Sequence, residues 1–420
     1  MKSEQIRLLV LTDISSLKGG FKEPDDTQSL VRLLLYANDF KIEGLIATYT
    51  KHWEDSKPEY IQAIVEAYGK VCENLKKHDS RYPAAPELLS KIKRGNPHCG
   101  MDQIGEGKDT EASEWIIHTV DEPDERPIWI VVWGAPTDLA QALWKVSHQR
   151  NREETAAFLE KIRVYAIGDQ YDESGPWIRE QFPQLIYIMS GYGMRGMYRT
   201  GEESLVTANW LAEHICREHG SLGEAYPIYD GGDPWGRVLG VKEGDTPSFL
   251  YLIPHTPGDP MHPEWESWGG LFQQVPGTRH YLDTESRHDV RECVSKWRPD
   301  YQADFAARMD WCVQDYAHAN HAPEVAIAGE TWRKIVPGEE IILDAGLSSD
   351  PDGDSLNYHW KLAEKKNCGE VQMEGIFEPV LRVKILDLQY GGEIRILLTV
   401  RDNGTPSLCS SVSIILSAEC

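Results

Sequence analysis

Three aspartates near the amino terminus have the residue type and the spacing of a cation site. Asp13 follows a short apolar run, and Asp25 and Asp26 stand together where a helical pattern begins. Carboxylates that are brought together and buried are costly unless a cation or a proton neutralises them. Calcium takes oxygen ligands of this kind, so the three residues predict a calcium site. A helix cap combined with surface acids is the alternative, and it accounts for Asp26 better than for all three.

The elements that must position these aspartates are alternating strands and helices. Strands are predicted at residues 8–12, 42–48, 128–133, 162–167 and 185–189, and helices at 27–37, 57–77, 110–120 and 137–146. Asp26 and Asp109 are the expected caps of the first and third of these helices. This alternation predicts an α/β fold, with an open, mostly parallel sheet and helices on both faces. Ligands bind such sheets at the carboxyl ends of the strands, where Asp13 is expected.

The pattern changes near residues 320–323, which predicts a domain boundary. Residues 220–286 are rich in Gly, Pro, Trp and His and are expected to form long irregular loops, and residues 301–319 are expected to form a helix. The short alternating strands beyond the boundary predict a small β-sandwich of the immunoglobulin-like type. We therefore expect an α/β domain at 1–323 and a sandwich at 324–420.

The overall charge disfavours several classes of partner. The chain has 420 residues and a formal net charge of −24. This acidity disfavours nucleic acid and anionic membranes and favours neutral or cationic ligands, with solubility alone as the alternative reason for it. No apolar stretch is long enough to span a bilayer, and no signal peptide is recognisable. A cytoplasmic protein is expected, or a secreted one if a leader has been removed.

The eight cysteines predict neither a metal site nor a redox motif, because no two of them have the Cys-x-x-Cys spacing. Eight are also too few for a disulfide scaffold in a chain of this length. Thiols in a reducing compartment are expected, with a bridge between Cys368 and Cys409 as the alternative.

The amino-terminal aspartates resemble a motif of the nucleoside hydrolases, D-x-D-P-G-x-D-D. Asp13 matches the second aspartate of that motif, and Asp25 and Asp26 match its closing pair. Leu11 stands in place of the first aspartate, and the loop between the matched positions is longer here. In that family these aspartates bind calcium, and one of them activates the attacking water.

Two further matches to the nucleoside hydrolases lie later in the chain. The stretch WGAPTDLAQAL is similar to the family's G-P-L-T-N-x-A-x-A-L, in which the threonine offers its backbone carbonyl to calcium. Thr137 inherits that role, and Asp138 replaces the asparagine. The family completes its calcium shell with the aspartate of a late His-Asp pair. Asp245 is the corresponding candidate, but Gly244 stands where the histidine would be.

A closer resemblance covers nearly the whole chain. It rests on five blocks in the same order: EPDDTQSLVRLLLYANDFKIEGLIATYT, GEGKDTEASEWII, VVWGAPTDLAQAL, IGDQYDESGPWIRE and EGDTPSFLYLI. They resemble the bacterial and fungal group of nucleoside-hydrolase-like proteins that is often described as cellulose-binding and carries a C-terminal Ig-like domain. Because nucleoside hydrolases commonly form oligomers, a homo-oligomer is left open.

Candidate substrate contacts follow from position. Asp169 stands where the nucleoside hydrolases place an asparagine that binds ribose hydroxyls. The other candidates lie in loops after strands or before helices: His52, Trp53, Glu106, Asp109, Glu173, Trp177 and Trp268. Trp265 and Trp268 are a candidate stacking platform, since the flat faces of sugars pack on indole rings. Capping, surface exposure or packing within the loops is the alternative for these residues.

The resemblance implies hydrolysis at an anomeric carbon with calcium as cofactor. The implied calcium ligands are Asp13, Asp25, Asp26, Asp245 and the Thr137 carbonyl. Calcium is expected to bind sugar hydroxyls and a water, and Asp13 to take the proton of that water. The carbon attacked has oxocarbenium character, and a single base favours inversion. The acid for the leaving group is left open among four residues: Glu243, Glu173, His52 and His280.

We therefore expect a calcium-dependent glycosyl hydrolase that acts on a carbohydrate or glycoside. The missing histidine at Gly244 and the tryptophan-rich loops favour such a substrate over a standard nucleoside. An N-ribohydrolase of nucleosides and a non-catalytic, cellulose-binding protein are the alternatives.

Overall fold

The computed structural model describes residues 4–18, 24–229, 231–233, 236–284, 289–336, 338–386 and 388–418, without the side chains of 388–390. The chain divides into two compact units. Unit 1 comprises Met1–Pro254 and Asp259–Asp315, and unit 2 comprises His255–Gly258 and Tyr316–Cys420. Unit 2 therefore includes a short segment from inside the first domain, whereas the sequence pattern placed the boundary after residue 323.

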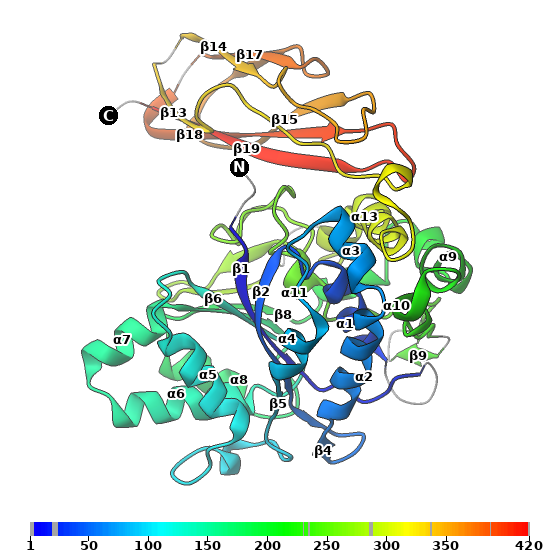
Figure 1. Ribbon diagram of the computed structural model, residues 1–420. Helices are drawn as coiled ribbons and strands as arrows, with labels where there is room; N and C mark the ends of the chain where they lie inside the picture. Colours follow the sequence, from blue (N-terminus) through cyan, green and yellow to red (C-terminus); the bar gives the residue numbers. More distant parts are fainter. Residues whose placement is uncertain are drawn as a thin grey trace. The chain divides into compact units, whose positions relative to one another are not determined.

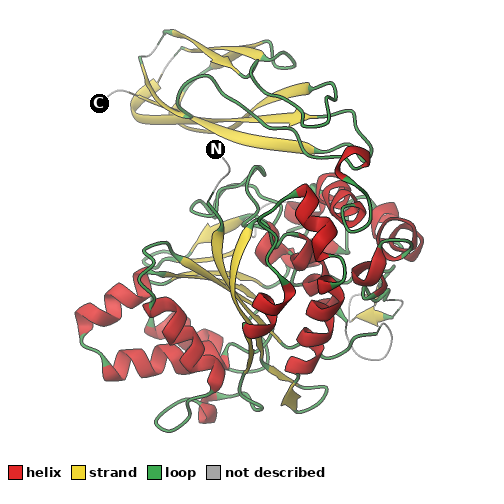
Figure 2. Ribbon diagram, in the orientation of Figure 1, coloured by secondary structure: helices red, strands yellow, loops and turns green. Residues whose placement is uncertain are grey.

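Unit 1 is built on an eight-stranded sheet (Figures 1 and 2). The strand order is β11 (Phe272–Gln274), β12 (His280–Asp283), β8 (Ile186–Ser190), β7 (Ile162–Ile167), β6 (Ile128–Val132), β1 (Ile6–Thr12), β2 (Phe40–Ala47) and β5 (Ile92–Arg94). All neighbouring strands are parallel except β11 and β12. The central strands are continuous buried runs, as expected for parallel strands covered on both faces. The predicted α/β class is confirmed.

Helices cover both faces of this sheet (Figure 1). On one face, α5 (Glu111–Asp121), α6 (Thr137–Gln149), α7 (Arg152–Glu160) and α8 (Ser174–Gln181) share a hydrophobic cluster with β1, β6 and β7. The opposite face carries α1 (Asp25–Leu35), α2 (Pro58–Gly69) and α13 (Arg298–Asp310). The shorter elements are α3 (Cys72–His78), α4 (Ala85–Ser90), α9 (Ala208–Leu211), α10 (Gly220–Glu224), α11 (Pro247–Leu250), α12 (Glu292–Ser295), β3 (Tyr49–Thr50), β4 (Asp55–Ser56), β9 (Gly232–Asp233) and β10 (Gly236–Arg237).

Several elements differ from their predictions. The helix expected at 57–77 is interrupted after Gly69, so it forms α2 and α3, and the helix expected at 301–319 ends at Asp310. The loop-rich stretch 220–286 contributes β11 and β12 to the sheet edge; its residues 230, 234–235 and 285–286 lie outside the described part of the chain. These two strands have three and four residues, too few to produce a recognisable periodic pattern.

Both predicted helix caps are wrong. Helix α1 begins at Asp25, and its N-cap residue is Pro24, whose side chain has no hydrogen-bond acceptor. Asp26 lies in the first turn, and its carboxylate accepts a hydrogen bond from Thr12. Helix α5 is capped by Thr110 rather than Asp109: the Thr110 hydroxyl accepts from the Ser113 backbone N–H, and the Ser113 hydroxyl accepts from the Thr110 N–H in return. Asp26 and Asp109 therefore do not cap these helices and form hydrogen bonds with other side chains.

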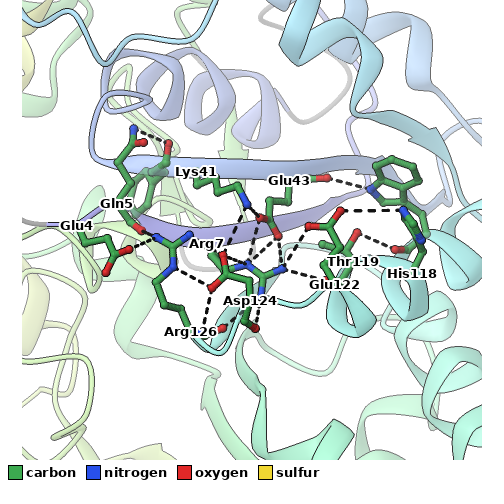
Figure 3. Close-up of polar contacts among 12 residues, drawn as sticks. Glu4, Gln5, Arg7, Lys41, Glu43, His118, Thr119, Glu122, Asp124 and Arg126 are labelled. Carbon is green, nitrogen blue, oxygen red and sulfur yellow. Dashed lines mark hydrogen bonds and ion pairs between the residues drawn. The ribbon is translucent and has the colours of Figure 1, made fainter.

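A network of charged side chains ties β1 to β2 and to the segment before β6 (Figure 3). The fully buried Arg7 guanidinium lies 2.7 Å from the Glu43 carboxylate and donates to the Thr119 backbone oxygen at 2.8 Å. The exposed side chain of Lys41 and the ion pair between Arg126 and Asp124 extend the network to the surface. A buried charge is tolerated when it is paired and hydrogen-bonded in this way, so the network supports the alignment of these strands.

Unit 2 consists of two sheets that enclose one core. The first has the order β13 (Trp332–Ile335), β19 (Cys409–Ala418), β18 (Leu388–Arg401) and β15 (Asn357–Cys368), and the second β14 (Glu340–Asp344), β17 (Val380–Ile385) and β16 (Val371–Glu374). All pairs are antiparallel except β13 and β19. Side chains from both sheets form one hydrophobic cluster around Trp360. Two packed sheets are confirmed, while the immunoglobulin-like type stays a prediction.

Within the described residues, no helix combines the length and the apolar character needed to cross a lipid bilayer. No disulfide joins Cys368 to Cys409, so the alternative of a bridge between them is wrong. Cys420 lies outside the described part of the chain.

Candidate metal centre

Four aspartates meet at the carboxyl ends of the central strands. Asp13 follows β1, Asp25 and Asp26 form the first turn of α1, and Asp245 lies two residues before α11. Carboxylate oxygens of Asp25, Asp26 and Asp245 lie within 4.8 Å of one another, and Asp13 shares a small cavity with Asp25 and Asp26. The fold thus brings together aspartates that are far apart in the sequence. Residues 19–23 of the long loop between Asp13 and Asp25 lie outside the described residues.

Burial and like charge make this cluster costly in the absence of a cation. Asp26 and Asp245 are 4% and 2% exposed. Burial raises the pKa of the Asp26 carboxyl, and the neighbouring Asp13 and Asp25 raise it further. Burial likewise raises the pKa of Asp245, followed by the charges of Asp26, Asp25 and Asp13, while Lys242 opposes the shift. Both groups therefore favour neutralisation.

One buried oxygen of the cluster calls for a ligand. Asp245 Oδ2 has no hydrogen-bond partner among the described residues. An unsatisfied buried carboxylate oxygen is energetically unfavourable, and a bound cation would satisfy it. The donor set consists of carboxylate oxygens, which are the ligands that calcium prefers. The residues therefore fit a calcium ion.

Surrounding groups hold Asp13 in one position. The Tyr171 hydroxyl donates to Asp13 Oδ2, and the Gly134 backbone passes so close that a Cβ there would lie 2.5 Å from the Asp13 Cβ. Tyr171 has a φ of 69°, which a bulky side chain rarely adopts and which is typical of functional sites. The orientation of Asp13 is thus fixed from two sides.

Two adjoining cavities share the side chains of Asp25 and Gln170. The first, which we call the ion cavity, has a volume of about 20 Å³ and is also lined by Asp13, Ser15, Asp26, His52 and Trp133. That volume suits a single water or ion. The second, the ligand cavity, has a volume of about 210 Å³, and the polar side chains that also line it are Arg195, Tyr198, Asp233, Lys242 and Asp245. The aspartate cluster therefore lies next to space for a small polar ligand.

In the loop after β7, a different residue from the predicted one faces the cavities. The Asp169 carboxylate pairs with Arg179 and accepts a hydrogen bond from the Tyr187 hydroxyl at 2.9 Å, and it lines neither cavity. The next residue, Gln170, lines both. Sequence reasoning missed Gln170, because a polar residue in an irregular loop produces no periodic signal.

Of the predicted contacts after β2, His52 lines the ion cavity. Trp53 is 44% exposed, and its indole N–H donates to the Ser15 carbonyl at 2.7 Å. Because Ser15 also lines the ion cavity, the structure brings both residues near the aspartates.

The other predicted contacts lie outside the lining of both cavities. Glu106, Asp109 and Glu173 are exposed, and Asp109 pairs with Lys145 at 2.8 Å. The tryptophans are packed: Trp177 against Phe182, Trp265 on His262 and Trp268 against Tyr301. Trp265 and Trp268 are 7% and 4% exposed, so they offer no open platform for a sugar ring.

Thr137 and Asp138 lie at the start of α6. The Thr137 hydroxyl donates to Asp172 at 3.0 Å, and Thr137 lines neither cavity, so its role as a ligand stays a prediction. Asp138 is buried and accepts hydrogen bonds from the Thr110 hydroxyl at 2.6 Å and the Asn96 backbone N–H at 3.0 Å. Burial raises the pKa of Asp138 to about 6, against the effect of these bonds.

Two of the four candidate acids have structural roles. The buried Glu243 pairs with Arg32 at 2.7 Å and accepts from the Tyr226 hydroxyl at 2.5 Å. His280 Nε2 lies 3.1 Å from the Phe182 carbonyl oxygen, and burial lowers the pKa of His280. Neither residue lines the ion cavity or the ligand cavity, whereas His52 lines the ion cavity.

Comparison with known proteins gives two family matches. Residues 7–272 match the family described as cellulose-binding Sde182, nucleoside hydrolase-like domain. Residues 340–418 match the C-terminal domain of the cellulose-binding protein Sde0182. No curated protein matches the chain.

Solved structures add one full-length likeness. A nucleoside hydrolase-related hypothetical protein from Saccharophagus degradans, associated with carbohydrate metabolism, has 33% sequence identity and a TM-score of 0.85, covering 99% of this chain and 100% of its own. The PKD domain of the KIAA 1837 protein has 24% identity and a TM-score of 0.19, over 24% of this chain and 92% of its own. A mouse clustered protocadherin has 19% identity and a TM-score of 0.16, over 26% of this chain and 36% of its own.

Proposed function

Because the chain belongs to the cellulose-binding Sde182 nucleoside-hydrolase-like family, we propose that unit 1 is a calcium-dependent glycosyl hydrolase that acts on a carbohydrate or glycoside. The observation that carries the proposal is the aspartate cluster, in which Asp245 Oδ2 is buried and has no partner among the described residues. The residues proposed to hold calcium are Asp13, Asp25, Asp26, Asp245 and, through its carbonyl, Thr137.

Asp13 is the proposed base. When bound, calcium would orient sugar hydroxyls and increase the acidity of a water. Tyr171 donates to Asp13 Oδ2, so the proton of the attacking water is assigned to Oδ1. The ligand cavity beside Asp25 would hold the sugar ring, whose anomeric carbon gains oxocarbenium character as the bond to the leaving group breaks. Asp13 acts as the single base, which favours inversion.

His52 is the proposed acid for the leaving group. It is the candidate that lines the ion cavity, and a histidine can donate a proton near neutral pH. The Arg195, Tyr198 and Lys242 side chains that line the ligand cavity are proposed to donate hydrogen bonds to sugar hydroxyls.

The direct test is the Asp26→Asn variant. We expect it to abolish calcium binding in titration calorimetry and to abolish release of product from a panel of p-nitrophenyl glycosides, inosine and uridine. The matched control is Asp344→Asn, which makes the same chemical change at an exposed position of β14. Unchanged calcium affinity in Asp26→Asn would contradict the metal assignment, and release of free base from inosine or uridine would favour an N-ribohydrolase instead.

A non-catalytic carbohydrate-binding protein is the second candidate, favoured by the cellulose-binding descriptions of both matched families. It predicts that the protein sediments with microcrystalline cellulose without producing reducing ends. It also predicts that Asp13→Asn binds as well as the wild type. If the wild type cleaves the substrate and Asp13→Asn does not, a non-catalytic function is excluded.

A further inference from the structure

We propose that Gln170 supplies an amide oxygen to the cation site, as a neutral ligand beside the aspartates. This inference rests on the proposed function, because it assumes that a cation occupies the ion cavity. Gln170 lies three residues after β7 and lines both cavities, a property it shares with Asp25. It therefore stands at the junction between the proposed positions of cation and substrate.

Hydrogen bonds determine which atom of the Gln170 amide is left for a cation. Nε2 donates to the backbone oxygens of Trp133 and Ile167, the latter at 3.1 Å. Carbonyl oxygens accept and do not donate, so the amide atom that faces them must be the nitrogen. Both N–H groups are thereby used, and the oxygen Oε1 is the amide atom that remains as a donor of lone pairs.

The loop around Gln170 is held in place on both sides. Gly168 and Tyr171 have φ values of 66° and 69°, the conformation that L side chains rarely adopt. Asp169 is fixed by Arg179, and Asp172 accepts a hydrogen bond from Thr137. The amide is thus positioned before any ligand arrives, which lowers the entropic cost of binding.

The chemistry of the cluster favours a neutral oxygen at this point. Calcium accepts amide carbonyls together with carboxylates. Asp25, Asp26 and Asp245 already place carboxylate oxygens within 4.8 Å of one another, so their like charges repel. An amide oxygen adds a ligand without adding to that repulsion.

The test compares Gln170→Leu and Gln170→Glu in the full-length protein, with calcium alone as the probe in titration calorimetry. We expect Gln170→Leu to bind calcium about tenfold more weakly, because it lacks the oxygen. Gln170→Glu keeps an oxygen for the cation but loses both N–H donors to Trp133 and Ile167, so its affinity should fall less than that of Gln170→Leu. Gln181→Glu, at the exposed end of α8, is the control for the added charge and should leave the affinity unchanged.

Two outcomes would overturn the inference. Wild-type affinity in Gln170→Leu would show that the oxygen is not a ligand. Equal losses in the Leu and Glu variants would show that the side chain acts by anchoring Trp133 and Ile167. Melting temperatures in EDTA would verify that each variant is folded. If Gln170→Leu weakens calcium binding but the wild type cleaves no glycoside, the hydrolase proposal fails and this inference stands. If the wild type cleaves a glycoside but Gln170→Leu binds calcium with unchanged affinity, the hydrolase proposal stands and this inference fails.

Discussion

At the scale of single residues, unit 1 contains two kinds of buried carboxylate. Asp138 has its burial compensated by hydrogen bonds from Thr110 and Asn96. Asp245 has an oxygen that no described residue satisfies. The first arrangement holds the chain together, and the second is prepared for a ligand.

Asp138 should make the stability of the protein depend on pH. Its folded pKa of about 6 is above the ordinary value of 3.8, so the folded state binds the proton more tightly than the unfolded state. The stability that this group contributes is present below pH 3.8 and is lost as the pH rises through 6. We expect Asp138→Asn to gain about 1 kcal/mol relative to the wild type between pH 5 and pH 7.5.

The measurement is urea denaturation of both proteins in EDTA at the two pH values. The Asp344→Asn variant of an exposed carboxylate should show no such gain. If the difference in the free energy of unfolding between Asp138→Asn and the wild type is the same at both pH values, the raised pKa assigned to Asp138 is wrong.

The aspartates of the site could be proposed from the sequence, because Asp13 ends an apolar run and Asp25 begins a helix. Gln170 could not, since a glutamine in a loop has no distinctive pattern and its role depends on two carbonyls from other parts of the chain. Trp265 and Trp268 resemble Trp53 as residues in loops. Tertiary packing buries Trp265 and Trp268 and leaves Trp53 exposed. The residues next to each tryptophan in the sequence do not predict this difference.

At the scale of elements, β1 links the site to the ion-pair network of Figure 3. Arg7 near its amino end belongs to the network, and Asp13 follows its carboxyl end. The network and the aspartate cluster are thus at opposite ends of one strand, which allows each to be disturbed separately.

Glu43→Gln should destabilise the protein without affecting calcium binding. It removes the carboxylate 2.7 Å from the fully buried Arg7 and leaves the longer pairs with Asp124 at 3.7 Å and Glu122 at 3.9 Å. Breaking a buried pair costs roughly 3–5 kcal/mol. Lys41→Met removes the exposed partner of the same carboxylate and should cost less than about 1 kcal/mol. Equal losses in the free energy of unfolding, measured in urea, would contradict this account of the network.

Long apolar strands such as β1, β6 and β7 were predictable because buried parallel strands leave a continuous apolar run. The edge strands β5 and β11, and the strand β12 next to β11, were missed because they are only three or four residues long. The break after α2 was missed as well: Gly69 packs so closely that a Cβ there would lie 2.9 Å from the Ala85 Cβ, a constraint that comes from a distant residue.

At the scale of the whole molecule, each unit has its own hydrophobic cluster, so we expect two unfolding transitions in calorimetry. Calcium should raise the transition of unit 1 alone, because the proposed ligands belong to that unit. At a free calcium concentration one hundred times the Kd, the stabilisation amounts to about 2.7 kcal/mol. EDTA should reverse the rise in the unit 1 transition, and the Asp26→Asn variant should not show that rise. If calcium raises the transitions of both units equally, the assignment of the calcium site to unit 1 is wrong.

The segment His255–Gly258 belongs to unit 2 although it interrupts unit 1. The Ser411 backbone N–H donates to the His255 carbonyl at 2.7 Å, and Arg395 donates to the Pro257 carbonyl at 3.2 Å. During synthesis this segment leaves the ribosome before Asp259–Asp315, whereas its partners in β18 and β19 come later in the chain. Unit 2 therefore cannot be completed until β18 and β19 have also been translated. A gene fragment that begins at Tyr316 would encode unit 2 without the segment His255–Gly258. Recombination therefore cannot transfer the whole of unit 2 as one continuous stretch of coding sequence.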